Sequence, residues 1–274
     1  CRTARQRPLA THVDALKRVT FQTQLGSQHD KSERVRALAK SIAAAIGADP
    51  ALADRAAELS KCDLLTHMVG EFPELQGLMG RYYALHDHEP AEVAEALREQ
   101  YLPRFAGDAL PATRTGMALS IADKLDTIAG IYATGQKPSG TRDPFGLRRA
   151  ALGLLRTSIE RGLDLDLQQL IGQAVAAAQA GMARVAVEQG KALGAIDTGK
   201  LAVEVYAYVI ERLRAYYVEG TADITVSVEA FDAVLATRPA SALDFDARLR
   251  ALVQFLQLPD AASLAAANKR IANI

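Results

Sequence analysis

The 274-residue chain has 32 basic and 32 acidic side chains, a formal net charge of zero, and 49% hydrophobic residues. This balance is typical of a globular protein and excludes a general electrostatic attraction to nucleic acid, so such binding would need local patches. Two cysteines, Cys1 and Cys62, are too few for a disulfide framework, which predicts a reducing cytoplasmic location. No apolar run approaches roughly 18 residues and no signal peptide pattern opens the chain, so no membrane span is expected.

Both ends of the sequence look cut. The chain begins at Cys1 without an initiator Met, and it stops at Ile274 inside a run with helical periodicity that has no capping residue. These features predict a fragment of a longer protein.

Helical periodicity runs through nearly every segment of the first two thirds. The first helix is expected to start at Asp30 as its cap, with Lys31 and Val35 on its apolar face. A second helix is expected after Pro50, with Asp63 at the end of its apolar face. The later helices are predicted at residues 75–86, 91–101, 118–132, 147–161 and 167–192.

The last third has its own helical pattern. Residues 190–200 form the best linker, and apolar faces then recur at Val205 to Tyr216, at Phe231 to Leu235 and at Phe245 to Leu256, with a fourth helix from residue 264. The sequence shows no convincing β-hairpin and no βαβ alternation, and residues 224–228 are assigned to a loop or helix start. The predicted fold class is all-α, with an N-terminal bundle and a smaller C-terminal bundle.

Three charged residues are predicted to point toward apolar surroundings: Lys31, Asp63 and Asp123. The strings KSERVRALA, LSKCDLL and SIADKLD resemble the HD superfamily of helical metal-dependent phosphohydrolases, whose pattern is a His, a His-Asp pair and a later Asp. Lys31 and Cys62 stand where the two imidazoles belong, while Asp63 and Asp123 are retained. An ammonium group cannot bind a metal, so the sequence predicts a degenerate site without metal.

Two interpretations of Lys31 remain open. In the first, Lys31 takes the place of the metal and pairs with Asp63 and Asp123. In the second, Lys31 is a surface residue of the first helical turn and Asp63 makes an ordinary buried hydrogen bond.

A basic turn, residues 136–150, lies between two predicted helices and reads QKPSGTRDPFGLRRA. Asp143-Pro144 resembles a cap with a first-turn proline, and a rigid basic turn at a helix start can hold phosphate. Its cations are Lys137, Arg142, Arg148 and Arg149. The alternative is a structured loop whose cations pair with acidic residues. The same alternatives apply to Lys269 and Arg270. The sequence contains no nucleotide-binding loop, no CxxC and no nucleophile signature, so no catalytic residue is predicted.

The distinctive strings together closely resemble the β subunit of bacterial glycyl-tRNA synthetase, nearly from end to end: DKSERVRALA, SKCDLLTHMVGEFPELQGLMGRYYAL, EQYLPRFAGDALPAT, ADKLDTIAGIYATGQKPSGTRDPFGLRRAALGLLR and SLAAANKRIANI. The resemblance implies an α2β2 enzyme whose α subunit activates glycine with ATP and Mg2+, while the β subunit binds glycine tRNA. It implies a C-terminal portion with a leading segment (1–28), an HD-like domain (29–192), a linker (193–200) and a truncated DALR-like anticodon-binding domain (201–274).

Under this resemblance the chain is a tRNA-binding part of glycine–tRNA ligase. It has no cofactor of its own and is inactive alone. The expected phosphate contacts are Lys137, Arg142, Arg148 and Arg149, with Lys269 and Arg270 as weaker candidates on the C-terminal module. Two alternatives are kept: a surviving HD-type phosphohydrolase, which Lys31 and Cys62 disfavour, and a purely structural module that docks the α subunit.

Overall fold

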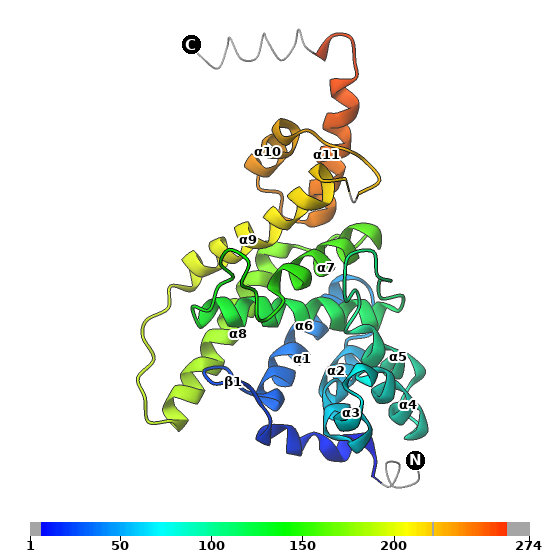
Figure 1. Ribbon diagram of the computed structural model, residues 1–274, viewed down its shortest axis with the longest axis vertical. Helices are drawn as coiled ribbons and strands as arrows, with labels where there is room; N and C mark the ends of the chain where they lie inside the picture. Colours follow the sequence, from blue (N-terminus) through cyan, green and yellow to red (C-terminus); the bar gives the residue numbers. More distant parts are fainter. Residues whose placement is uncertain (1–6, 221, 262–274) are drawn as a thin grey trace.

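The computed structural model describes residues 7–220 and 222–261, and it is mostly helical (Figure 1). The prediction of a helical protein is therefore confirmed, whereas the two named bundle types stay predictions. The helices are η2 (Leu9–His12), η3 (Asp14–Arg18), α1 (Gln28–Ala45), α2 (Pro50–Leu59), η4 (Cys62–Leu65), α3 (His67–Glu71), η5 (Pro73–Leu75), α4 (Leu78–His86), α5 (Ala91–Glu99), α6 (Arg114–Ala133), α7 (Leu147–Glu160), α8 (Leu167–Glu188), α9 (Thr198–Val218), α10 (Val228–Ala236) and α11 (Ala242–Leu256).

A short β-hairpin precedes α1, so the prediction of no hairpin is wrong. Strands β1 (Thr20–Gln22) and β2 (Gly26–Ser27) pair in antiparallel fashion. Gly26 has φ +89°, which a side chain would strain, and the Gln22 side chain accepts hydrogen bonds from the backbone of the turn. The strands are too short to give an alternating pattern in the sequence.

The start of α1 differs by one turn from the prediction. Ser27 is the N-cap, and Asp30 completes a capping box by accepting a hydrogen bond from the Ser27 amide at 2.7 Å. The predicted apolar face is correct, because Val35 is buried together with Lys31. Asp63 lies beyond α2, in the 3-10 helix η4, so its predicted place on that helix is wrong.

Helix α6 is the centre of the fold. It crosses the middle of the molecule in Figure 1 and packs against α1, α5, α7 and α8. Most of its side chains are buried, including the charged residues Lys124 and Asp126. Because α6 is so deeply buried, its charged side chains contact charged side chains of other elements, such as Lys31 and Arg34 of α1.

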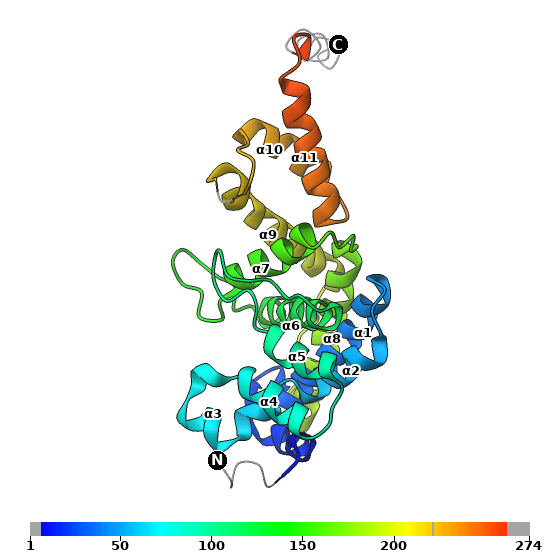
Figure 2. The ribbon, with the colours of Figure 1, turned by 90° about the vertical axis from the view of Figure 1, so that its right-hand side faces the viewer.

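Helix α9 joins the C-terminal helices to the rest. Residues 189–197 separate α8 from α9 where the linker was predicted, and α8 ends earlier than residue 192, just before Gly190 with φ +64°. Helix α9 packs on α6, α7 and α8, so the hydrophobic core continues across the linker. Figure 2 shows α10 and α11 lying beyond α9, away from α1 to α5. The domain boundary itself remains a prediction.

Helix α8 is long and apolar enough on average to cross a membrane by length and composition, although polar side chains such as Gln173 and Gln179 interrupt its apolar residues. Core helices of globular proteins meet the same test. The charged residues Arg184 and Glu188 lie in its last turns, and its buried face packs against α1, α6 and α9. The absence of a membrane span stays a prediction.

Candidate functional site

Six charged side chains meet in the interior between α1, the start of η4 and α6. We call them the core charge cluster: Lys31, Arg34, Lys61, Asp123, Lys124 and Asp126. Their burial has a local cause, because Lys31 and Arg34 lie one turn apart on α1, facing Asp123 and Asp126, which are also one turn apart on α6.

Lys31 is held inside this cluster by α6. Its Nζ lies 3.3 Å from Asp123 Oδ1 and 3.1 Å from Asp126 Oδ2, and it donates a hydrogen bond to Thr127 Oγ1 at 2.8 Å. Arg34 binds both carboxylate oxygens of Asp126, at 2.7 and 3.2 Å. The predicted Lys31–Asp123 pair is confirmed. The interpretation of Lys31 as a surface residue is wrong, because it is 3% exposed.

Asp63 takes no part in the cluster, so the predicted Lys31–Asp63 pair is wrong. Among the residues that the structure describes, no ion pair joins the two. The Asp63 carboxylate instead accepts hydrogen bonds from the amides of Gly77 and Gly80, at 2.6 and 3.1 Å, and so caps the start of α4. Burial raises the pKa of Asp63, and these amides partly oppose the rise. The alternative of an ordinary buried hydrogen bond for Asp63 is confirmed.

The donor set is a poor match for a metal ion. Burial, followed by the neighbouring Asp63 charge, raises the pKa of the Cys62 thiol to about 12, so it is protonated. Asp123 contacts the ammonium groups of Lys31 and Lys61, whose attraction outweighs burial and lowers the pKa of Asp123. Within residues 7–220 and 222–261, no three His, Cys, Asp or Glu side chains gather in a way that could hold a metal. The cluster therefore neutralises its own carboxylates.

Lys124 connects the cluster to the loop at residues 100–113. Its Nζ donates hydrogen bonds to the carbonyl oxygens of Gln100 and Leu102 and to Ser120 Oγ, at 2.7 to 3.1 Å. Burial lowers the pKa of Lys124 to about 7, with Asp123 opposing that effect. The loop is thus fastened to α6 by a buried polar network.

A cleft of about 520 Å3 opens over the core charge cluster; we call it the arginine cleft. Asp123 and Lys124 line it from α6, Arg149 lines it from α7, and Arg104 lines it from the loop before α6. In the described part of the chain, neither guanidinium group makes an ion pair or a side-chain hydrogen bond, in contrast to most other arginines. Two arginines without a protein partner at one cleft can receive an anion.

The predicted basic turn divides into two kinds of residue. Lys137 pairs with Glu204 at 2.5 Å and lies over the Tyr132 ring, and Arg148 donates a hydrogen bond to the Gly140 carbonyl, so these two follow the structural alternative. Arg142 and Arg149 are exposed and have no side-chain partner among the residues with described positions.

The cap of α7 is also more complex than predicted. Asp143 accepts hydrogen bonds from the amides of Leu147 and Arg148, at 2.8 and 2.9 Å, while Gly146 with φ +65° is the N-cap. Pro144 therefore precedes the helix, and the prediction of a proline in its first turn is wrong. Lys269 and Arg270 lie outside the described residues.

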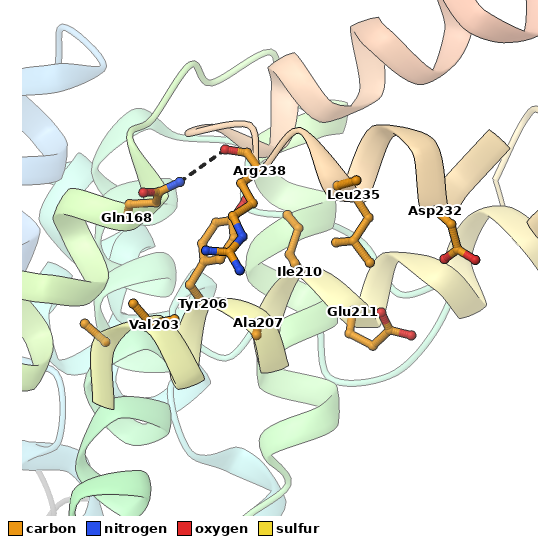
Figure 3. Close-up of a pocket in the computed structure, with 11 residues that line it drawn as sticks. Gln168, Val203, Tyr206, Ala207, Ile210, Glu211, Asp232, Leu235 and Arg238 are labelled. Carbon is orange, nitrogen blue, oxygen red and sulfur yellow. Dashed lines mark hydrogen bonds between the residues drawn. The ribbon is translucent and has the colours of Figure 1, made fainter. Parts of the chain in front are cut away.

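A second hollow lies between α9 and α10, and it has a different character (Figure 3). Its volume is about 710 Å3, and side chains such as Ile210 and Leu235 make it mostly apolar. The carboxylates of Glu211 and Asp232 line it as well, against a single cation, Arg238. Both carboxylates pair with Arg214, so they are not free, but among the described residues Arg238 is the one cation that lines this hollow, whereas two unpartnered arginines line the arginine cleft, which is therefore the better anion site.

Sequence reasoning missed several members of the site. Arg34 and Asp126 each follow a predicted residue by three positions, so helical spacing could have found both. Lys61 and Lys124 are direct neighbours of Cys62 and Asp123 in the sequence. Arg104 lies in a segment read only as a loop, and nothing local marks it as unpaired.

Comparison with known proteins gives a consistent result. A family model described as "Glycyl-tRNA synthetase beta subunit" matches residues 2–236. The glycine–tRNA ligase beta subunit of Hahella chejuensis is 50% identical over 272 residues, which is 99% of this chain and 37% of that protein. The corresponding protein of Ectopseudomonas mendocina is 51% identical over 259 residues, covering 94% of this chain and 35% of the relative. The chain thus spans little more than a third of these relatives.

Proposed function

The chain belongs to the family of glycyl-tRNA synthetase beta subunits, and on that premise we propose that it is a tRNA-binding part of a glycine–tRNA ligase. The observation that carries the proposal is the pair of unpartnered arginines, Arg104 and Arg149, which line one cleft. The exposed Arg142 belongs to the same basic turn as Arg149. Because the net charge of the chain is zero, this local excess of cations is what can attract the RNA backbone.

In this proposal, the activation of glycine takes place on a different subunit. An α subunit of the α2β2 enzyme activates glycine with ATP and Mg2+, and this chain holds the glycine tRNA in the cytoplasm for protein biosynthesis. The HD-like region (29–192) contacts the tRNA body or acceptor arm, and the DALR-like region (201–274) faces the anticodon, where unstacked bases can be read. The chain supplies neither a catalytic residue nor a cofactor site.

The core charge cluster supports binding over hydrolysis. Hydrolysis at an HD-type site needs carboxylates that are free to hold metal ions, whereas Asp123 is neutralised by two ammonium groups and Asp63 is used as a helix cap. The cluster instead fixes α1 and the loop carrying Arg104 onto α6. The alternative function, a metal-dependent phosphohydrolase, predicts hydrolysis of nucleotides or phosphodiesters with Mn2+, and the present proposal predicts none.

The test is binding of a glycine tRNA transcript to the 274-residue chain over a range of salt concentrations. Replacing Arg104 and Arg149 with Ala should weaken binding and reduce the slope of log K against log salt by about 0.7 to 0.9 for each lost phosphate contact. Arg18→Ala is the matched control, because Arg18 is also exposed and has no side-chain partner in the part of the chain described. No binding at low salt would favour the remaining alternative, a module that docks the α subunit.

A further inference from the structure

Phe105 stands on a loop beside the arginine cleft, where most of its apolar ring is exposed to solvent. It is 62% exposed, compared with 53% for Tyr82 and 51% for Phe72, the other strongly exposed aromatic residues of the described chain. Exposing a ring of this size costs free energy that burial would recover. An exposed ring at a fixed position therefore marks a surface that meets something else.

The loop that carries Phe105 is held in one shape by its own hydrogen bonds. The Asp108 carboxylate accepts a hydrogen bond from the Arg104 amide at 2.8 Å, and the Asp108 amide donates to the Phe105 carbonyl at 3.2 Å. At the base of the loop, Lys124 and Ser120 both donate to the Leu102 carbonyl. The ring is thus presented on a short, closed loop whose order does not have to be gained on binding.

Arginines surround the ring. Arg148, Arg149 and Arg156 of α7 line a hollow of about 150 Å3 together with Phe105, and Arg104 precedes the ring in the chain. We call these five residues the Phe105 face. Arg156 pairs with Glu160, yet one of its terminal nitrogens is buried and has no hydrogen-bond partner. The exposed guanidinium groups of Arg104 and Arg149 are the cations of this face that a ligand can reach.

The composition of the Phe105 face points to RNA more than to protein. The hollow is lined by the apolar residues Pro103, Ala106 and Leu152 and by three guanidinium groups, with no carboxylate among its lining residues, and this excess of positive charge favours a polyanion. Arginine with an aromatic platform is the combination used for single-stranded nucleic acid: the base stacks on the ring and the phosphates meet the cations. In Figure 2, the loop carrying Phe105 and the basic turn before α7 project on the same side of the molecule, so one strand could reach both.

We infer that the Phe105 face holds an unpaired nucleotide of the bound RNA, with its base stacked on Phe105 and its flanking phosphates on Arg104 and Arg149. This inference rests on the proposed tRNA-binding function and adds where a single-stranded segment lies. A paired stem cannot make the same contact, because its bases are stacked on one another.

The sequence offers a direct probe, since the chain contains no tryptophan. Phe105→Trp keeps a stacking ring and introduces a single fluorophore. Short single-stranded RNA should quench its emission, and a blunt RNA duplex of equal length should not. Val187→Trp is the control, because Val187 is 78% exposed near the end of α8, away from the arginine cleft. Quenching of both tryptophans alike would show collision rather than stacking and would contradict the inference.

Affinity measurements separate stacking from simple apolar contact. Phe105→Leu keeps an apolar side chain without a flat ring and should weaken binding of single-stranded RNA by about fivefold to a hundredfold, while Phe105→Trp should bind as the original chain does. Far-ultraviolet circular dichroism would verify that both variants fold, as expected for an exposed position.

Failure of the inference and failure of the proposed function would look different. If glycine tRNA binds and the Arg104 and Arg149 variants weaken it, but Phe105→Leu has no effect, only the inference is wrong. If no RNA binds the chain under any condition, the proposed function fails as well. If Phe105→Leu leaves RNA binding intact but weakens assembly with the α subunit, the Phe105 face is a protein interface and the inference is overturned.

Discussion

Replacing Asp126 with Asn tests whether the core charge cluster holds the fold together. Asp126 is completely buried and accepts three hydrogen bonds from two buried cations: two from Arg34, at 2.7 and 3.2 Å, and one from Lys31, at 3.1 Å. The amide removes the negative charge while keeping the shape, so both cations lose their shared counter-charge. Breaking a buried ion pair from one side typically costs about 3 to 5 kcal/mol. That is a large share of the roughly 5 to 15 kcal/mol that keeps a typical protein folded.

The assay is urea unfolding of the 274-residue chain followed by far-ultraviolet circular dichroism. Asp14→Asn is the matched control, because Asp14 is exposed and pairs only with Lys17 at the surface, so its midpoint should stay near that of the original chain. The double variant Arg34→Met with Asp126→Asn should lose less stability than the two single variants added together, since one unpaired cation is gone. If Asp126→Asn unfolds at the same urea concentration as Asp14→Asn, the reasoning about the cluster is wrong.

Three further outcomes follow from other buried groups. Gly77→Ala should destabilise the chain by at least about 1 to 2 kcal/mol in urea titrations, because Gly77 has φ +79° and an added Cβ would lie 2.7 Å from the Tyr101 ring. Lys124 has a pKa lowered by burial to about 7, so between about pH 7 and its ordinary value of 10.5 the folded chain binds fewer protons than the unfolded one. The free energy of unfolding should therefore rise with pH in that window, and Lys124→Met should flatten the rise when unfolding is measured at several pH values. Cys62, buried and with its pKa raised to about 12, should react with a thiol reagent only after denaturant is added, in a Cys1→Ser background.

The helical periodicity could be predicted from sequence because apolar faces repeat locally. The buried position of Lys31 was visible for the same reason, since it shares a face with Val35. Of its two acidic partners, only Asp123 could be predicted, because it belongs to a sequence motif. Predicting Asp126 requires knowing which face of α6 packs against α1. Contacts between helices distant in sequence decide such pairs, and one sequence does not contain them.

The break between α2 and Asp63 could not be predicted from local signals. The sequence after Leu59 has no glycine or proline to end the helix. Gln100, from a distant segment, ends the helix there. Its side chain donates a hydrogen bond to the Ser60 carbonyl and accepts one from Lys61 Nζ, both at 2.7 Å. Tertiary hydrogen bonds thus override helix propensity here, and they release Asp63 to cap α4.

The basic turn shows the same limit for function. Its cations are equivalent in the sequence, yet Lys137 is taken by Glu204, which lies 67 positions away, while Arg149 is free. Arg104, the second unpaired arginine of the cleft, lies in a loop to which the sequence analysis assigned no function. Which cations are available to a ligand is settled by folding, and that is why the site was recognised only in part.

Crosslinking of glycine tRNA to the complete ligase, with the crosslinked peptides mapped onto this chain, tests the central claim most directly. The account predicts crosslinks in residues 101–113 and 136–150, and their loss when Arg104 and Arg149 are replaced with Ala. Crosslinks that fall outside both segments, for example only around the hollow between α9 and α10, would contradict it.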